Sequence, residues 1–188
     1  GQDVGAWGEV SVSCGDVSVE VRAGAAGQAR TAVAVAATSC GMGFGNGGVH
    51  IPHANAYPSA AKVRDFHPKD YPQDEAMVPH GMSVSLTAPE AFRFTFSAAP
   101  ERHIRAAELL APGADRPSKP SEFLPTVLVA LMRDIDIPNG IAAVGFGDGD
   151  VADLVEGTMK QQRLLATSPR QVTDDDIGQI FRRSMELW

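Results

Sequence analysis

The chain has 188 residues, of which 44% are hydrophobic and 21% charged, so it carries enough apolar material for one well-buried domain and little sign of general disorder. Its formal net charge of −7 argues against nucleic acid or an anionic membrane surface as the main partner, because both require a basic face. Cys14 and Cys40 provide neither a disulfide framework nor a zinc knuckle. Without a basic leader or an apolar stretch of the ~20 residues that a membrane span needs, the sequence predicts a cytoplasmic protein.

The first residues differ in pattern from the rest of the chain. Residues 9–13 and 17–21 alternate apolar and polar side chains on either side of a turn signal at residues 14–16, which is typical of a short β-hairpin. We therefore separate residues 1–27, an atypical segment that forms a β-hairpin or is not native to the protein, from residues 28–188. The helical period begins there, and we expect these later residues to form one helical domain.

Periodic apolar side chains and helix-end signals predict an all-α arrangement for this second part. In chain order, we expect first an Ala-rich helix over Ala29–Ser39 and then an extended surface loop over 58–79. A capping box at Thr87–Glu90 predicts the start of the next helix, and two more helices are expected over Pro100–Ala111 and Ser121–Ile135. The last two predicted helices are capped by Asp150 and Thr173. The buried face expected of the last helix consists of Ile177, Ile180, Phe181, Ser184 and Trp188.

A glycine cluster at residues 41–48 admits two interpretations. Gly43–Gly48 satisfies the G-x-G-x-x-G pattern, and if Thr31–Val35 were the strand before it, residues 30–70 would open a dinucleotide-binding unit. Such a unit continues with alternating strands and helices, whereas this sequence continues with helix after helix. We therefore favour the other interpretation, in which the glycines let helices approach closely or free the backbone near a ligand.

Five histidines are candidate metal ligands, and three of them stand out. His50 and His53 are three residues apart, so on a helix they share a face, and His80 lies in a Pro-His-Gly motif. Imidazole nitrogen suits Fe²⁺ or Zn²⁺, and such an ion polarises an alkoxide or carbonyl oxygen. Because a catalytic metal usually takes three protein ligands, these residues amount to half a site. His67 is expected to be solvated, and His103 is expected to be a surface or boundary residue.

Two runs of residues carry a resemblance to a known family. Two segments closely resemble the iron-containing alcohol dehydrogenases, which have the dehydroquinate-synthase-like fold. They are residues 41–58, Gly-Met-Gly-Phe-Gly-Asn-Gly-Gly-Val-His-Ile-Pro-His-Ala-Asn-Ala-Tyr-Pro, and the later Val78-Pro-His-Gly. The spacer between them and the stretches 83–95, 140–145 and 157–163 look like the hydroxyacid-oxoacid transhydrogenase branch of that family in particular.

The resemblance implies that residues 28–188 are the C-terminal helical domain of such a protein. In the family, an N-terminal Rossmann-like domain binds NAD(P), and an aspartate and three histidines hold Fe²⁺, or Zn²⁺ in its place. Two of these histidines map by motif onto His53 and His80. His50 and Tyr57 are implied on the substrate side, and many members carry another active-site histidine at the position of Tyr57. No Asp-x-x-x-His motif precedes residue 50 and no phosphate loop is found, so we assign no catalytic and no cofactor-binding residue.

The implied parent protein is an oxidoreductase that moves a hydride between a small hydroxy or oxo acid and a nicotinamide, while the metal stabilises the alkoxide. The chain alone is expected to be inactive, because half of the metal site and the nucleotide site are missing. Lys62, Arg64 and Lys69 are candidate contacts for an acidic substrate. Two alternatives stay open: a stand-alone helical module that binds a partner or forms a homo-oligomer, and a free-standing metal-binding protein.

Overall fold

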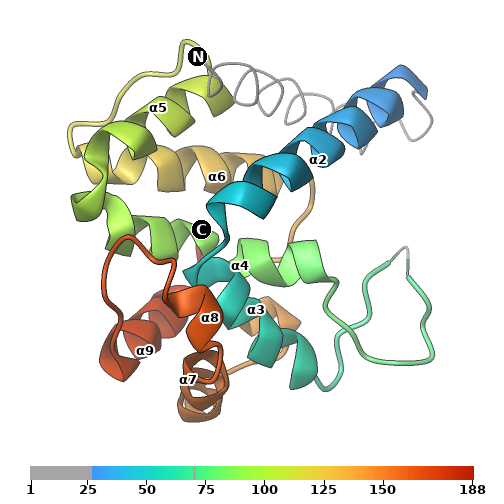
Figure 1. Cartoon of the computed structure of the whole chain (residues 1–188). Coiled ribbons are helices and arrows are strands. Elements are labelled where there is room, and N and C mark those ends of the chain that lie inside the picture. Colours follow the sequence, from blue (N-terminus) through green and yellow to red (C-terminus); the bar gives the residue numbers. More distant parts are fainter. Residues whose placement is uncertain (1–26, 70) are drawn as a thin grey trace. The chain divides into compact units, whose positions relative to one another are not determined.

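The computed structural model describes residues 27–69 and 71–188, and every regular element in them is a helix (Figure 1). The all-α prediction is therefore confirmed for the described part of the chain. The β-hairpin expected near the N-terminus lies outside the described residues, and the domain boundary at residue 27 stays a prediction.

The helices follow one another with short connections, except for a longer loop between α3 and α4. The α-helices are α2 (Gly27–Gly47), α3 (Ile51–Ala61), α4 (His80–Thr95), α5 (Pro100–Leu110), α6 (Phe123–Asp134), α7 (Val151–Met159), α8 (Gln162–Leu165) and α9 (Asp174–Arg183). Short 3₁₀ turns are η1 (Phe96–Ala98), η2 (Pro120–Glu122), η3 (Ala142–Val144) and η4 (Asp148–Asp150).

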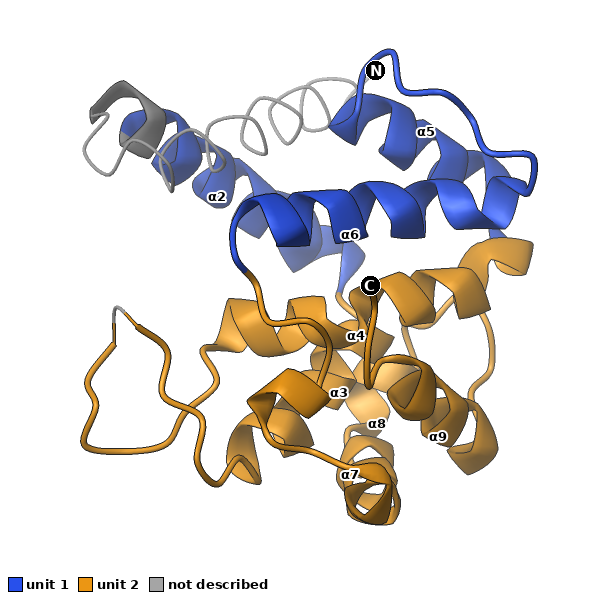
Figure 2. Cartoon of the chain, turned by 180° about the vertical axis from the view of Figure 1, so that it is seen from behind, with its two compact units in different colours: residues 1–48, 99–136 blue, residues 49–98, 137–188 orange. Residues whose placement is uncertain are grey.

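These helices group into two compact units, each built from two separate stretches of the chain (Figure 2). In the described residues, the first unit contains 27–48 and 99–136, and the second contains 49–98 and 137–188. The linear order of helices did not predict this division, because the chain leaves the second unit after η1, builds α5 and α6, and then returns.

The second unit is organised around α3, which contacts α4, α7 and α8, while α9 contacts α4 and α7. Side chains from these helices and from the segment before η4 form its apolar core. The buried members of this core are Ile51, Val78, Leu86, Ala91, Ile141, Val144, Phe146, Val151, Leu154, Ile177, Ile180 and Phe181. Because protein interiors are close-packed, a continuous core of this kind fixes the positions of the helices that contribute to it.

A glycine allows α3 and α7 to lie unusually close together. A β-carbon added at Gly157 of α7 would lie only 2.6 Å from Cβ of Pro58, which is buried in α3. Atoms in packed side chains do not approach to that distance, so any larger residue at 157 would push the two helices apart.

The start of α9 agrees with the sequence analysis. The hydroxyl of Thr173 accepts a hydrogen bond from the backbone nitrogen of Asp176 at 3.2 Å, and the carboxylate of Asp176 accepts one from the backbone nitrogen of Thr173 at 3.0 Å. The expected buried face is found at Ile177, Ile180, Phe181 and Ser184. Trp188 is only partly buried, because it lies beyond the end of the helix.

The segment that leads into η3 is anchored to the end of the chain. Gly140 has a φ of +75°, and a β-carbon there would lie 2.4 Å from the carbonyl oxygen of Met185. Next to it, the backbone nitrogen of Ile141 donates to the carbonyl oxygen of Ser184 at 2.8 Å. Both the left-handed conformation and the close approach require glycine at this position.

The glycine cluster proves to be helical. α2 runs through residues 41–47 and through Thr31–Val35, so this stretch forms no strand–turn–helix and the dinucleotide-binding interpretation is wrong. The favoured alternative also fails in part. Within the described residues, a β-carbon at Gly41, Gly43 or Gly45 would meet nothing within 4 Å, so these glycines permit no close helix contact there.

The capping box predicted at Thr87–Glu90 is wrong as well. Both residues lie inside α4, which begins earlier, at His80, with Pro79 as its N-cap. A threonine followed three residues later by glutamate is also compatible with a helix interior, and here the threonine hydroxyl bonds to a buried side chain of another helix.

Asp150 precedes α7 as predicted, but its side chain makes no capping bond to that helix. Its carboxylate accepts a hydrogen bond from the backbone nitrogen of Gly147 at 2.9 Å and pairs with Arg64. The helices expected over 100–111 and 121–135 are present within about two residues of their predicted ends, and the loop predicted from residue 58 begins after Ala61.

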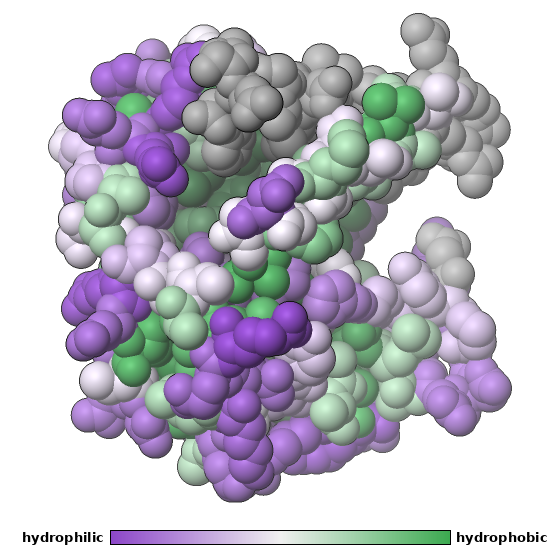
Figure 3. All heavy atoms as spheres, viewed as in Figure 1, coloured by the Kyte–Doolittle hydropathy of each residue, from purple (hydrophilic) through white to green (hydrophobic). Residues whose placement is uncertain are grey.

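The first unit is packed more openly than the second. α5 contacts α6, and both contact η2. On α2, the large apolar side chains of Val35, Met42 and Phe44 are 55%, 64% and 55% exposed. Figure 3 shows hydrophobic and weakly polar residues along much of this helix.

Candidate metal centre

The start of α3 holds three of the residues that the sequence singled out. His50 occupies the N-cap position, and its carbonyl oxygen accepts hydrogen bonds from the backbone nitrogens of His53 at 2.9 Å and Ala54 at 3.1 Å. Pro52 suits the first turn, where its missing N–H costs the helix nothing. Tyr57 lies four residues after His53, so the two side chains share one face of the helix.

His80, the first residue of α4, lies beside that face. The ring centroids of His53 and His80 are 5.4 Å apart, and their planes are inclined by 58°. The ring of Tyr57 lies 6.4 Å from that of His80 at an angle of 72°. His53 is partly buried, whereas His80 and Tyr57 are exposed. The structure thus brings the two motif histidines and Tyr57 into one cluster, which we call the His53–His80 cluster.

The surroundings of His53 favour its neutral form. Burial lowers the pKa of His53 from its ordinary value, and the neighbouring His80 lowers the pKa further, because two positive imidazoles repel each other. A metal ion binds imidazole only through a nitrogen that carries no proton. The cluster therefore keeps His53 in the form that coordinates metals.

His50 makes a different contact. Its ring lies edge-on to Phe92 of α4, with centroids 5.9 Å apart and planes at 90°. The ring is partly buried. The role of His50 on the substrate side stays a prediction.

The two remaining histidines differ from each other. His67 is exposed, as expected. His103, expected at the surface or at its boundary, lies in α5, where its Nδ1 is 2.8 Å from the carbonyl oxygen of Ala99. It is not a surface residue, and its exposed fraction of 9% is that of a residue at the edge of the interior.

The described residues do not form a complete metal coordination sphere. Across residues 27–69 and 71–188, no three histidine, cysteine, aspartate or glutamate side chains are grouped so that they could hold an ion. The chemistry of the pair nevertheless fits a divalent metal, since two adjacent imidazoles, one of them kept neutral, are typical ligands of iron and zinc.

Two of the cations proposed as substrate contacts are already paired. Lys62 donates to the carbonyl oxygen of Asp153 at 3.1 Å and lies 3.4 Å from its carboxylate, and Arg64 pairs with Asp150. Both partners lie at or near the start of α7. A substrate carboxylate would have to compete with these acids, so the structure weakens the case for Lys62 and Arg64.

The sequence analysis missed a buried polar group beside the cluster. Asn55, Thr87 and Thr158 come from α3, α4 and α7 and are fully buried, and the side chain of Asn55 is hydrogen-bonded to both threonine hydroxyls. Nothing in the sequence indicated that Asn55 is buried, although a buried amide requires hydrogen-bond partners. The partners themselves lie 32 and 103 residues away, and no local pattern reveals them.

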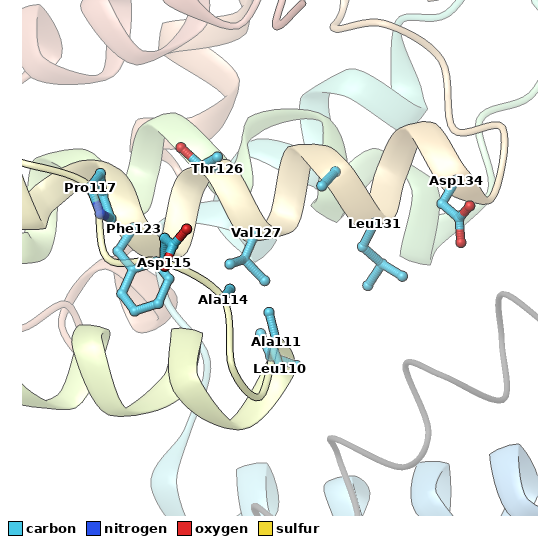
Figure 4. Close-up of a pocket in the computed structure, with 11 residues that line it drawn as sticks. Leu110, Ala111, Ala114, Asp115, Pro117, Phe123, Thr126, Val127, Leu131 and Asp134 are labelled. Carbon is cyan, nitrogen blue, oxygen red and sulfur yellow. The ribbon is translucent and has the colours of Figure 1, made fainter.

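A cavity of about 580 Å³ lies elsewhere, in the first unit (Figure 4). It lies along α5 and α6 and is mostly apolar, with the carboxylates of Asp115 and Asp134 among its lining residues. None of the four site residues predicted from the sequence lines it, because all four belong to the second unit.

Comparisons with known proteins agree with the motifs that surround the cluster. Residues 17–185 match the model of the Fe-containing alcohol dehydrogenase family, C-terminal. The chain belongs to this family. The resemblance drawn from the two histidine motifs is thereby confirmed, and the parent family is one of oxidoreductases.

Within the Fe-containing alcohol dehydrogenases, the chain is similar to proteins named hydroxyacid-oxoacid transhydrogenase, mitochondrial. Over 148 residues it is 42% identical to the one from Xenopus tropicalis, and 39% identical to those from Bos taurus and Homo sapiens. These alignments cover 77% of this chain but only 31% to 32% of the relatives, so the chain spans about a third of their length.

Solved structures show the same family fold. A 1,3-propanediol oxidoreductase matches with a TM-score of 0.81 and 24% identity over 97% of this chain and 44% of its own. An alcohol dehydrogenase from Oenococcus oeni matches with a TM-score of 0.75 and 26% identity over 93% of this chain and 43% of its own.

The cellular location remains a prediction. None of the helices in the described residues has the length and apolar character required to cross a membrane. The relatives are named as mitochondrial proteins, so they lend no specific support to the cytoplasmic location expected from the sequence.

Proposed function

We propose that His53 and His80 are two ligands of a divalent metal ion, iron or zinc, in the C-terminal domain of an enzyme like the hydroxyacid-oxoacid transhydrogenases. The spacing of the two rings carries this proposal. Two imidazoles bound to one ion through bonds of about 2.1 Å place their ring centroids roughly 4.5–5.3 Å apart. The rings lie 5.4 Å apart, so small side-chain rotations suffice to reach a common ion.

In the intact enzyme, the bound ion would stabilise negative charge on the oxygen of a small hydroxy or oxo acid while a hydride moves to or from NAD(P). The residues of this chain have separate tasks. His53, held neutral, and His80 bind the ion. Tyr57, which is 48% exposed and has its ring beside that of His80, would contribute to substrate binding, as would His50.

Metal binding by the chain tests the ligand assignment directly. Titration with Co²⁺, followed by its visible absorption, should show weak binding, because only two protein ligands are available. His53→Ala and His80→Ala should each lower the affinity by about 10-fold or more. His67→Ala, which removes an exposed histidine from the loop, is the matched control and should leave the affinity unchanged. Equal affinities in all four proteins would refute the assignment.

Activity tests the wider function. We infer that the chain alone gives no nicotinamide turnover, since its sequence contains no Asp-x-x-x-His motif and no phosphate loop. A fusion to the N-terminal two thirds of a hydroxyacid-oxoacid transhydrogenase should transfer hydride from a hydroxy acid, and should lose that activity on His53→Ala. A fusion that binds metal but turns over no hydroxy acid would contradict the substrate class while leaving the metal site intact.

The second candidate function is a helical module that binds a partner or forms a homo-oligomer. The three exposed apolar side chains of α2 favour it, because large apolar surfaces usually mark interfaces. Sedimentation of the chain distinguishes the two functions. A concentration-dependent dimer that dissociates in a Met42→Lys, Phe44→Lys variant supports the module, and a monomer at all concentrations counts against self-association.

A further inference from the structure

The side chain of Asn55 links three helices in the interior of the second unit. Its amide nitrogen donates to the hydroxyl of Thr87 on α4 at 3.2 Å, and its amide oxygen accepts from the hydroxyl of Thr158 on α7 at 3.2 Å. All three residues have no exposed surface. Both ends of the amide are therefore used, one toward each neighbouring helix.

These bonds are directional, in contrast to the apolar contacts around them. An amide offers a donor at one end and an acceptor at the other, and a threonine hydroxyl can meet either, but both bonds form only while the amide lies within hydrogen-bond distance of both hydroxyls. Apolar side chains tolerate small sliding motions, whereas a buried polar group that loses its partner is destabilised. The Asn55 bonds thus select one axial register of α3 relative to α4 and to α7.

The same two helices carry the histidines. Asn55 follows His53 by two residues on α3, and Thr87 follows His80 by seven residues on α4. Residues seven apart lie on one face of an α-helix, two turns along its axis. A shift of α3 along α4 would therefore break the bond between Asn55 and Thr87 and change the distance between the two histidine rings together.

Close packing of α3 against α7 supports the same register from the other side. Pro58 of α3 lies against Gly157, next to Thr158 in the sequence, so the backbone of α7 comes near enough for the Thr158 hydroxyl to reach the amide. In addition, the hydroxyl of Ser59 donates to the carbonyl oxygen of Asn55 at 2.8 Å.

We propose that Asn55 is a positioning residue, which through Thr87 sets the register of α3 on α4 and thereby holds the rings of His53 and His80 at metal-binding distance. The register part stands on the structure alone. The consequence for metal binding rests on the function proposed above. In this role Asn55 acts through the helices that carry the two histidines.

A matched pair of variants at position 87 tests the proposal. Thr87→Val keeps the shape of the side chain but removes the hydroxyl, whereas Thr87→Ser keeps the hydroxyl and removes a methyl group. Two quantities are measured for the full chain: the nuclear Overhauser effect between the ring protons of His53 and His80 without metal, and the Co²⁺ affinity. We expect Thr87→Val to weaken or abolish the ring-to-ring signal and to lower the affinity about 10-fold. Thr87→Ser should change neither by more than about 3-fold.

A control variant outside the hydrogen bonds of Asn55 distinguishes a positioning role from a general effect on stability. Ile180→Val removes one methyl group from the same core, on α9, and should lower the midpoint of thermal unfolding without altering the ring-to-ring signal or the affinity. Thr87→Ala is the second variant if Thr87→Val does not fold. If a folded variant without the hydroxyl retains both the signal and the affinity, the positioning role of Asn55 is overturned.

The result also separates this inference from the proposed function. If the wild-type chain binds no Co²⁺ but Thr87→Val still loses the ring-to-ring signal, the metal site is wrong and the register role stands. If the wild-type chain binds Co²⁺ through His53 and His80, and Thr87→Val leaves signal and affinity unchanged, the metal site stands and the register role is wrong.

Discussion

The two units of the chain are stabilised in different ways. The second unit has a continuous apolar core, a buried hydrogen-bonded amide and a helix closed by a capping box. The first unit has a cavity of about 580 Å³ along α5 and α6, and its longest helix exposes three large apolar side chains. All four residues that we connect with metal or substrate lie in the second unit.

This contrast shows where structural precision is required. Metal ligands must be held within fractions of an ångström, so they are best carried by elements that packing and hydrogen bonds fix from several sides. α3 is such an element, since it contacts α4, α7 and α8 and carries both His53 and Asn55. In the described residues, the first unit carries none of the ligands that we propose, and its interior is looser.

The largest difference between the units is expected from removal of a phenylalanine ring. Phe181 is fully buried in the core of the second unit, whereas Phe123 is buried but lines the cavity of the first. Phe181→Ala should lower the free energy of unfolding by ~3–5 kcal/mol, because it leaves a void in close packing. Phe123→Ala should cost less, since fewer atoms surround that ring. Urea unfolding followed by circular dichroism measures both, and equal losses would contradict the proposed difference in packing.

Glycine-to-alanine substitutions in the two units should change the stability of the protein in opposite directions. Gly157→Ala places a β-carbon 2.6 Å from Cβ of Pro58 and should destabilise the protein by ~1–3 kcal/mol. Gly41→Ala, on α2, meets nothing within 4 Å and should be neutral or stabilising by up to ~1 kcal/mol, because alanine favours the helix. Thermal unfolding of the two variants provides the measurement. A stabilising Gly157→Ala would show that α3 and α7 are free to separate.

A smaller effect is expected at the start of α9. Thr173→Ala removes the hydroxyl that accepts from the backbone of Asp176, and should cost ~1 kcal/mol. Thr126→Ala, at an exposed position of α6, is the matched control in the first unit and should change stability by less than ~0.5 kcal/mol. Denaturant midpoints compare the two variants, and similar values would mean that the cap of α9 contributes nothing.

Much of the second unit could be predicted from the sequence where the signals are local. The cap at Thr173 and the buried face after it follow from residues within one short stretch. The pairing of His53 with His80 was also implied, although by resemblance to a family and not by spacing. Imidazoles 27 positions apart in the chain meet only because α3 and α4 pack together.

Other features depend on contacts between distant residues and could not be predicted. The local pattern at Thr87 predicted a helix cap, but its hydroxyl bonds to Asn55, which lies on another helix. Asp150 was predicted to cap α7, but its carboxylate pairs with Arg64. In both cases a polar side chain with a plausible local partner is used by tertiary structure, which overrides the local preference.

The ionisation of His53 should respond to its neighbour in the metal-free protein. Its pKa lies below the ordinary value, chiefly because of burial and then because of repulsion from His80. His80→Gln should therefore raise the pKa of His53, but not to 6.5, since the burial remains. Chemical shifts of the His53 ring followed against pH in the presence of a chelator measure the change.

The same shift determines the sign of a small dependence of stability on pH. The folded state binds the proton of His53 less readily than the unfolded state, so the neutral form is favoured by folding. The stability that depends on this group is fully present above the unfolded pKa of 6.5, and it is lost as the pH falls through the folded pKa. A His53→Gln variant should lose less stability than the wild type between about pH 7.5 and 5. Parallel losses in both proteins would mean that folding does not lower the pKa of His53.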